Sequence, residues 1–475
     1  MPSRKYFRQV ELPSLYMSCL SEVENELRDV AHFATNTDLW TSRSTQPYMS
    51  LTIHFITSNW TLCSRCLQTS YFPGDHTGDL IAQGLRESLQ SWGLQENRQV
   101  CVTTDNATNN IRALQLNNWT RLQCFGHRLH LAIEKGMKLP QVDRAVGVCK
   151  KVVSAFSNTW KRRRELAVAQ GELGLPVHQL ITETVNRWGS RQKMIDRVIE
   201  QEKAISQVLR EDKKTRHLIP TWQDMDVLEF ISKALRPLTE FTDALSGEDY
   251  VSVSYLKPVL HLFNKTIVAP QEDDTQLTKN IKDKILEYLN EKYADPDTED
   301  LLDMASFVDP RFKTKYIKEE KVEYIMSKAA AEIEEMVVNQ NAESPVATQP
   351  ETEEAVADPA VPAKKKHKGL GSYFKKKATQ QVPPLSNRNL IDFELKSYLQ
   401  AMETDSDTDP LQWWKLHEMN FPKLSNLAKK YLCIPATSSP SERAFSTSGN
   451  IVTCHRSVLK PETVDQLVFL AHNLK

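Results

Sequence analysis

Residues 48–57, YMSLTIHFIT, alternate strictly between apolar and polar side chains, and this period of two strongly limits the conformation of the segment. Such alternation is typical of a β-strand, because successive side chains of a strand point to opposite faces. HFATNTDLWTS (32–42) and TLCSRCLQTSYF (61–72) are further strand candidates on either side of it. The few polar residues at 57–60 predict a hairpin turn, so we expect three antiparallel strands in succession. The apolar face of the central strand consists of Met49, Leu51, Ile53 and Phe55.

The pattern changes after this hairpin, and helices begin to alternate with strands. TGDLIAQGLRESLQSWGL (77–94) has apolar residues at helical spacing, and RQVCVTTDNATNN (98–110) is a short apolar strand followed by a polar helix start. RLQCFGHRLHLAI (121–133) begins as a strand and continues as a helix. This order predicts an α/β fold with a ribonuclease-H-like core, in which helices cover the faces of a mixed sheet.

The chain divides into five segments by composition and periodicity. Residues 1–30 form a helical lead-in, and residues 31–140 form the first part of the core. Residues 141–338 are helical throughout and form an insertion. Residues 339–386 are rich in Pro, Glu and Lys and cannot bury enough apolar surface to fold, so we expect a disordered linker there. Helical periodicity resumes in residues 387–475, which we expect to complete the core.

Length and composition set the broad class of the protein. A chain of 475 residues is long enough for two or three domains, or for one core with a large insertion. Its formal net charge of -1 gives the whole chain no attraction for nucleic acid, so a DNA partner would contact local basic patches. Eight cysteines without regular spacing favour free thiols in a reducing compartment. No apolar run approaches the roughly 20 residues that span a bilayer, and the N-terminus lacks a signal peptide's apolar core, so we expect a soluble intracellular protein without a membrane partner.

Two aspartates follow strands that we expect to be neighbours. Asp38 lies near the end of the first predicted strand, and Asp105 lies at the end of the fourth. Carboxylates at the ends of adjacent strands can share a Mg²⁺ or Mn²⁺ ion, since these cations prefer oxygen ligands. The alternative is that both are turn or helix N-cap residues, which is a strong rival for Asp105 because NATNN follows it. Glu442, in SSPSERAFSTSGNIV (438–452), would by itself be a surface charge on a short helix.

Two cysteine motifs allow either a metal site or simple packing. Cys124 and His127 have CxxH spacing, but zinc needs about four ligands and no second pair stands at finger-like spacing. We therefore favour a structural role for this pair at a strand-to-helix turn. Cys63 and Cys66 would face opposite sides of a strand, and we interpret them as packing residues.

Three basic motifs are candidates for contact with nucleic acid or transport factors. NRWGSR places Trp188 between Arg187 and Arg191, which can stack on and pair with single-stranded nucleic acid, but the motif alone favours a buried anchor tryptophan with solvated flanks. KRRRE (161–165) is typical of a solvated helix face, although it can also meet phosphates. The lysine block Lys364–Lys377 favours recognition by the nuclear import machinery over a merely solubilising role.

The C-terminal segment KPETVDQLVFLAHNLK predicts an amphipathic helix that begins at Pro461. An apolar stripe on so short a helix needs a partner surface, which is either the chain's own core or another subunit. The stripe consists of Val464, Leu467, Val468, Ala471 and Leu474.

Several of these motifs together resemble the hAT superfamily of DNA transposases, and most closely the BED-zinc-finger (ZBED-type) group derived from it. The resemblance is carried by TDLWTS, TTDNATNN, CFGHRLHLAI, RWGSR and, most specifically, the C-terminal SSPSERAFSTSGNIVT and PETVDQLVFLAHN. It is strongest over residues 32–135 and 387–475. It implies a ribonuclease-H-like core interrupted by an all-helical insertion, with a C-terminal dimerisation region that contains the apolar stripe.

The resemblance also implies roles for individual residues. In active members of the family, two aspartates and one glutamate bind two divalent metals that cleave and join DNA. By motif these residues are Asp38, Asp105 and Glu442, and the metal would be Mg²⁺ or Mn²⁺. The pair of Cys124 and His127 matches the family's CxxH. The Trp188 motif matches a tryptophan near the DNA hairpin formed during excision.

These implications give three functional hypotheses. The first is a domesticated nuclear regulator that homodimerises through its C-terminal region and binds DNA or chromatin partners. The second is an active metal-dependent transposase or nuclease, and the third is an inert remnant that merely folds. The acidic triad favours the enzyme. The near-neutral charge and the absence of a BED-like Cys/His array favour the regulator, which we expect.

Overall fold

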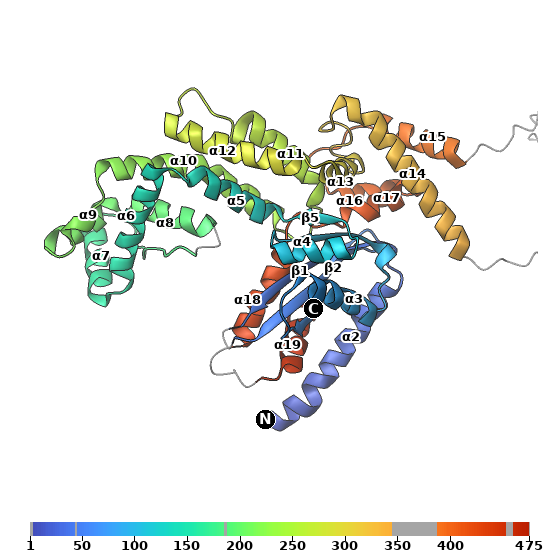
Figure 1. Cartoon of the computed structure of the whole chain (residues 1–475), viewed down its shortest axis with the longest axis horizontal. Helices are drawn as coiled ribbons and strands as arrows, with labels where there is room; N and C mark the ends of the chain where they lie inside the picture. Colours follow the sequence, from blue (N-terminus) through green and yellow to red (C-terminus); the bar gives the residue numbers. More distant parts are fainter. Residues whose placement is uncertain (1–2, 43–44, 185–187, 344–386, 453–458, 475) are drawn as a thin grey trace, which may run out of the picture.

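The computed structural model describes residues 3–42, 45–184, 188–343, 387–452 and 459–474 (Figure 1). Its centre is a five-stranded mixed sheet with the order β3-β2-β1-β4-β5. The hairpin strands are antiparallel, whereas β1 with β4 and β4 with β5 are parallel, which confirms the predicted α/β fold. The strands are β1 (Phe33–Thr41), β2 (Pro47–Ile56), β3 (Leu62–Tyr71), β4 (Gln99–Thr104) and β5 (Arg121–Gln123).

Strand β2 is buried on both faces, although its alternation is typical of a strand with one polar face. His54 lies on the polar face and is hydrogen-bonded to the side-chain oxygen of Asn36 on β1. Burial lowers the pKa of His54 to about 3, so the imidazole is neutral in the folded protein. The polar face is therefore an interior hydrogen-bonded layer, covered by segments that arrive later in the chain.

Helices cover the sheet on both sides. One hydrophobic cluster joins α2, α3 and α4 to the strands, and a second joins α5 to the C-terminal segment. Cys63 and Cys66 belong to different clusters, which confirms that they face opposite sides of β3. These covering helices are α2 (Leu12–Arg28), α3 (Gly78–Ser91), α4 (Thr108–Leu116), α5 (Phe125–Met137), α18 (Ser439–Ile451) and α19 (Pro461–Asn473).

Helix α19 is attached to β3, an outer strand of the sheet, by side chains that bind the strand's backbone. The Thr69 N–H donates to Asp465 Oδ1 at 2.5 Å. The Cys66 N–H donates to Asn473 Oδ1 at 3.2 Å, and Asn473 Nδ2 donates back to the Cys66 carbonyl at 2.7 Å. The C-terminal helix thus satisfies backbone groups that no neighbouring strand pairs.

The insertion extends from the sheet as an elongated helical arm, with α7 and α9 at its far end (Figure 1). Within the described residues, no helix is long and apolar enough to cross a membrane. Helix α14 continues to Glu343, beyond the predicted end of the insertion at residue 338, and the rest of the predicted linker lies outside the described residues. The helices of this part are α6 (Pro140–Ser157), α7 (Trp160–Glu172), α8 (Trp188–Glu200), α9 (Glu202–Glu211), α10 (Trp222–Leu245), α11 (Leu256–Leu262), α12 (Gln276–Tyr293), α13 (Pro296–Phe307) and α14 (Glu319–Glu343).

Three further helices precede α18, and short helical turns complete the fold. The three helices are α15 (Asn387–Gln400), α16 (Pro410–His417) and α17 (Pro422–Leu432). The short turns are α1 (Arg4–Tyr6), η1 (Phe7–Glu11), η2 (Glu96–Arg98), η3 (Arg216–Leu218), η4 (Val253–Tyr255) and η5 (Phe263–Ile267).

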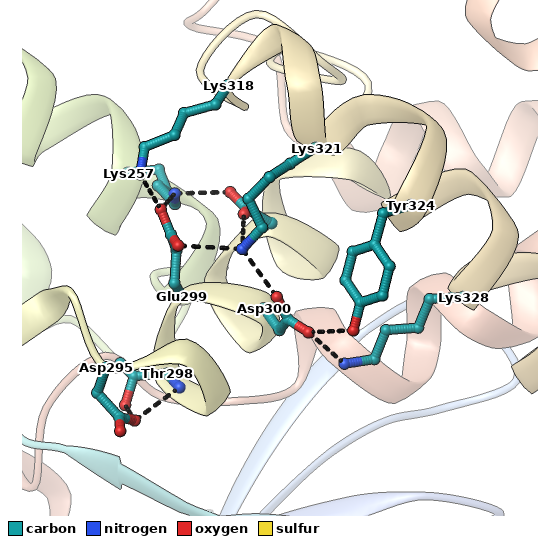
Figure 2. Close-up of polar contacts among 10 residues, drawn as sticks. Lys257, Asp295, Thr298, Glu299, Asp300, Lys318, Lys321, Tyr324 and Lys328 are labelled. Carbon is teal, nitrogen blue, oxygen red and sulfur yellow. Dashed lines mark hydrogen bonds and ion pairs between the residues drawn. The ribbon is translucent and has the colours of Figure 1, made fainter.

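A network of ion pairs, the α13 cluster, joins α11, α13 and α14 (Figure 2). Lys321 lies at its centre, with Nζ 3.0 Å from Glu299 Oε2 and 2.9 Å from Asp300 Oδ1. Burial alone would raise the pKa of Glu299, but hydrogen bonds from Lys318 and Lys321 lower it to about 2. The carboxylates of the cluster are Glu299, Asp300 and Asp303, and the lysines are Lys257, Lys318, Lys321 and Lys328.

Candidate functional site

Asp38 lies on β1, opposite Ser50 of β2, and its side chain is partly buried. The Leu39 N–H donates to Asp38 Oδ1 at 2.8 Å. Burial and the neighbouring carboxylates of Asp105 and Glu442 raise the pKa of Asp38 to about 7, against the lowering effects of the Leu39 N–H and His127. Asp105 and Glu442 are therefore near enough to Asp38 to disfavour its ionisation.

Asp105 follows β4, the parallel neighbour of β1, and leads into α4. Its Oδ1 accepts hydrogen bonds from the Ala107 N–H at 3.1 Å and from Asn110 Nδ2 at 2.8 Å. The turn-residue alternative is thus correct for one carboxylate oxygen, whereas the N-cap of α4 is Ala107. Asp105 also raises the pKa of Asp38.

Arg121 on β5 supports the turn that carries Asp105, although no sequence motif singled it out. Its guanidinium donates to the Asp105 carbonyl at 2.6 Å and to Asn106 Oδ1 at 2.9 Å. Burial and the nearby Arg128 lower the pKa of Arg121 to about 10. A three-residue strand has too few positions to show a period, so no pattern marked this residue as important.

Glu442 reaches the sheet because the segment before α18 is bonded to it residue by residue. Asn36 Nδ2 donates to the Thr437 carbonyl at 3.1 Å, and the Ser438 N–H donates to Cys124 Sγ at 3.2 Å. Pro435 and Ala436 also accept hydrogen bonds, from Thr103 Oγ1 at 2.8 Å and from the Phe125 N–H at 3.0 Å. The last part of the core is thereby attached to β1, β4 and α5 despite the long insertion.

Cys124 and His127 connect the strand-to-helix turn to Glu442. Cys124 is buried at the N-cap of α5, and His127 Nδ1 lies 3.9 Å from Glu442 Oε1. A hydrogen bond with Cys124, together with the charges of Cys124 and Glu442, raises the pKa of His127 to about 9 although burial opposes this. Burial raises the pKa of the Cys124 thiol, but hydrogen bonds with His127 and Ser438 lower it on balance. The pair orients a cationic imidazole beside Glu442.

The donor set suits a divalent cation in chemistry but is not a closed coordination shell. Across the described ranges, no group of three or more His, Cys, Asp or Glu side chains is placed to hold a metal ion. Asp38, Asp105 and Glu442 nevertheless supply the oxygen ligands that Mg²⁺ and Mn²⁺ prefer. The pKa of Asp38 is raised first by burial and then by the charges of Asp105 and Glu442, and a bound cation would oppose both effects.

Comparison with protein families accounts for most of this architecture. Residues 36–125 match the ZBED1 RNase-like domain, residues 122–234 match the ZBED1 RNase-like helical domain, and residues 394–474 match the hAT family C-terminal dimerisation region. The chain is an hAT/ZBED-type protein. The predicted family resemblance and fold class are therefore confirmed.

Individual relatives of this hAT/ZBED-type chain match along most of its length. It is 27% identical over 495 residues to the human Zinc finger BED domain-containing protein 4, covering 100% of this chain and 40% of the relative. It is 23% identical over 505 residues to the Putative AC transposase of Zea mays, covering 98% and 59%. It is 22% identical over 470 residues to the Zinc finger BED domain-containing protein RICESLEEPER 2 of Oryza sativa subsp. japonica, covering 90% and 63%. The chain thus spans less than two thirds of the length of these relatives.

Trp188 and Arg191, the two predicted DNA-binding residues of the hAT/ZBED-type chain that the structure describes, do not form an exposed surface. Trp188 at the start of α8 is 5% exposed and belongs to the largest hydrophobic cluster, so its ring cannot stack on a base in this conformation. Arg191 is paired with Glu134 at 2.5 Å and with Glu183 at 2.8 Å. The buried-anchor alternative is correct for Trp188, because its large apolar area contributes most when buried. Arg187 lies outside the described residues.

The predicted dimerisation stripe divides between the chain's own core and its surface. Val464 and Val468 are 0% exposed and pack in a cluster with Tyr48 and Cys66, so they are not available to a second subunit in this conformation. Leu467 is partly exposed, whereas Ala471 and Leu474 are exposed. The expected five-residue surface is therefore reduced to three residues, because the sheet buries the other two.

Proposed function

We propose that this chain is an hAT transposase-derived nuclear protein that homodimerises through its C-terminal region and binds DNA or chromatin partners as a domesticated regulator. The match of residues 394–474 to the hAT dimerisation region carries the proposal. A further relative, 24% identical over 519 residues, is named Putative transcriptional regulator tpeD in Talaromyces stipitatus, and the regulatory part draws support from it. The proposed nuclear import block, Lys364–Lys377, lies outside the described residues.

Self-association is tested by point substitutions on exposed side chains of the matched region. Leu474 is 52% exposed at the end of α19, and Met419 in the same region is 90% exposed. By light scattering, we expect a dimeric mass for the wild type and for the control Met419→Asp. Leu474→Asp should have a monomeric mass, because a charge at the subunit interface would lose its hydration on association. A monomeric wild type would refute self-association. If only Met419→Asp is monomeric, the subunit interface does not include α19.

A second candidate function is metal-dependent cleavage and joining of DNA, and the effect of Asp105 and Glu442 on the pKa of Asp38 favours it. Asp38, Asp105 and Glu442 would hold Mg²⁺ or Mn²⁺, and the cation would lower the pKa of bound water and stabilise the leaving oxygen. Arg121 would keep Asp105 in position through the following turn. His127, as an imidazolium, would orient Glu442 until that carboxylate is needed as a ligand.

Cleavage of hairpin or element-end DNA with Mg²⁺ or Mn²⁺ separates the two candidates. We expect metal-dependent products from an active enzyme to disappear in Asp105→Ala. The control is Asp295→Ala, since Asp295 also accepts a backbone hydrogen bond just before a helix, from the Thr298 N–H at 3.0 Å, but it is the N-cap of α13. Equal loss in both variants would point to destabilisation and not to chemistry. A wild type that cuts neither substrate would exclude the enzyme and leave the regulator.

A further inference from the structure

Trp160 is the first residue of α7, at the far end of the helical arm (Figure 1). It is 72% exposed, an unusual position for so large an apolar ring. The guanidinium carbon of Arg164 lies 5.1 Å from the centroid of the Trp160 ring. The two side chains form a solvent-exposed aromatic and cationic platform.

Two basic segments distant in the sequence meet beside this platform. KRRRE (161–165) and REDKKTR (210–216) each carry four cationic side chains and together carry three acidic ones. They are joined by an ion pair between Arg162 Nη2 and Asp212 Oδ2 at 3.2 Å. This end of the arm is therefore strongly positive although the chain as a whole has a formal charge of -1. The exposed cations are Lys161, Arg163, Arg164, Arg210, Lys213, Lys214 and Arg216.

Some of these cations also have structural contacts, which separates them into two groups. Arg162 donates to the Ala155 carbonyl at 3.2 Å, and Arg163 donates to the Phe156 carbonyl at 3.4 Å, so both complete the end of α6. Lys213 and Lys214 are exposed in the loop between α9 and η3. Substituting these two lysines therefore changes the charge of the surface with little effect on the packing of the arm.

We propose that Trp160, Arg164 and the basic segments 161–164 and 210–216 form a contact surface for unpaired DNA; this rests on the DNA binding in the proposed function. An exposed indole ring can stack on any base, while lysine and arginine side chains pair with the phosphates. An acidic peptide would use the positive charge but offers no flat aromatic partner for the ring. Stacking also favours single strands over duplexes, whose bases already stack on one another.

The test is the binding of a fluorescein-labelled single-stranded DNA of about 20 nucleotides, and of its duplex, followed by anisotropy. We expect Trp160→Ala to weaken single-strand binding roughly tenfold and duplex binding much less, because one base no longer has a ring to stack on. The matched control is Trp222→Ala: Trp222 is also 72% exposed but begins α10 and lies outside the segments 161–164 and 210–216, so its removal should change binding much less. Both tryptophans are exposed enough for the variants to keep the fold, which circular dichroism checks.

The charge component is measured by the dependence of binding on salt. The double variant Lys213→Gln/Lys214→Gln should weaken binding to both single-stranded and duplex DNA. The slope of the logarithm of the binding constant against the logarithm of the salt concentration, measured between about 50 and about 200 mM salt, should become shallower by about 1 for each phosphate that no longer pairs with a lysine. If the wild type binds DNA and none of these substitutions changes the affinity, the DNA-binding surface lies elsewhere and the proposed DNA binding still holds. A wild type that binds neither DNA form would overturn both proposals. Equal weakening of single strand and duplex by Trp160→Ala would refute the stacking role.

Discussion

The α13 cluster and the carboxylates at the sheet edge are two acidic groups with different surroundings. In the α13 cluster, lysines from α11 and α14 approach the carboxylates, and the pKa of Asp300 falls to about 2 (Figure 2). At the sheet edge, Asp38 has carboxylates as neighbours, and its pKa rises to about 7. Burial raises the pKa in both places, so the sign of the neighbouring charges decides the net direction.

The carboxylates of α13 are already neutralised, and their effect is to hold α14 against α13. At the sheet edge, burial and two neighbouring carboxylates oppose the ionisation of Asp38, so its charged form destabilises the fold unless a cation or proton is added. Such strain is the reason to look for chemistry at the sheet edge and not in the insertion.

The largest expected effect comes from removing the charge of Asp38. Its pKa is raised to about 7 in the folded protein, above its value in the unfolded chain, so its ionisation destabilises the fold as the pH rises from about 4 to about 7. Asp38→Asn should therefore be more stable than the wild type by about 3 kcal/mol at about pH 8, and the difference should vanish near pH 4. Urea unfolding at both pH values measures this. An equal gain in the free energy of unfolding at both pH values would indicate better packing and not the removal of an unfavourable charge.

The next effect comes from removing the central lysine of the α13 cluster. Lys321→Met leaves Glu299, Asp300 and the fully buried Asp303 short of positive charge, and should lower the free energy of unfolding by about 2 kcal/mol. The control is Lys233→Met, which breaks ion pairs of a 53% exposed side chain with Asp273 and Asp274 and should change the free energy of unfolding much less, because solvent screens these charges. Urea unfolding at neutral pH compares them. Similar destabilisation in both variants would contradict the special role of the cluster.

The smallest expected effect is on the acid side of the stability profile. Hydrogen bonds from Tyr324, Lys321 and Lys328 outweigh burial and lower the pKa of Asp300 to about 2, so its stabilising contribution is present above about pH 4 and lost as the pH falls to about 2. Asp300→Asn should be less stable than the wild type by about 1 kcal/mol at about pH 6, after allowance for solvent screening, with the difference closing near pH 2. Thermal unfolding across this range tests it. A difference that does not depend on pH would assign the effect to the missing hydrogen bonds alone.

The elements of the core were predictable because their patterns are local. The alternation in residues 48–57 corresponds to β2 (Pro47–Ile56), and the segment 61–72 corresponds to β3 (Leu62–Tyr71). The burial of the polar face of β2 was not predictable, since it depends on Thr437 and its neighbours reaching Asn36 from the other end of the chain. Short-range periodicity says nothing about such contacts.

The strand pattern placed Asp38 and Asp105 at the ends of neighbouring strands, but only the family resemblance connected Glu442 with them. Nothing in the sequence around Glu442 indicates that Asp38 lies nearby, and the long helical insertion removes any information in their spacing. For Trp188 the motif alone favoured a buried anchor and the family resemblance implied contact with DNA; tertiary packing buries the ring. Trp160 is exposed, and its basic neighbours 210–216 are placed by a contact between helices.

The attachment of α19 to β3 has a consequence for how copies of this chain can meet. An outer strand with free backbone groups is a template for pairing with a strand of another molecule. Asp465 and Asn473 occupy such groups on Thr69 and Cys66, so the last helix protects the sheet from edge-to-edge aggregation. A chain cut before Pro461 would lose that protection, and the backbone groups of β3 at the edge of the sheet would be free to pair with another molecule. Truncation would therefore create association of a new kind, and a larger mass after the cut would say nothing about the proposed dimer.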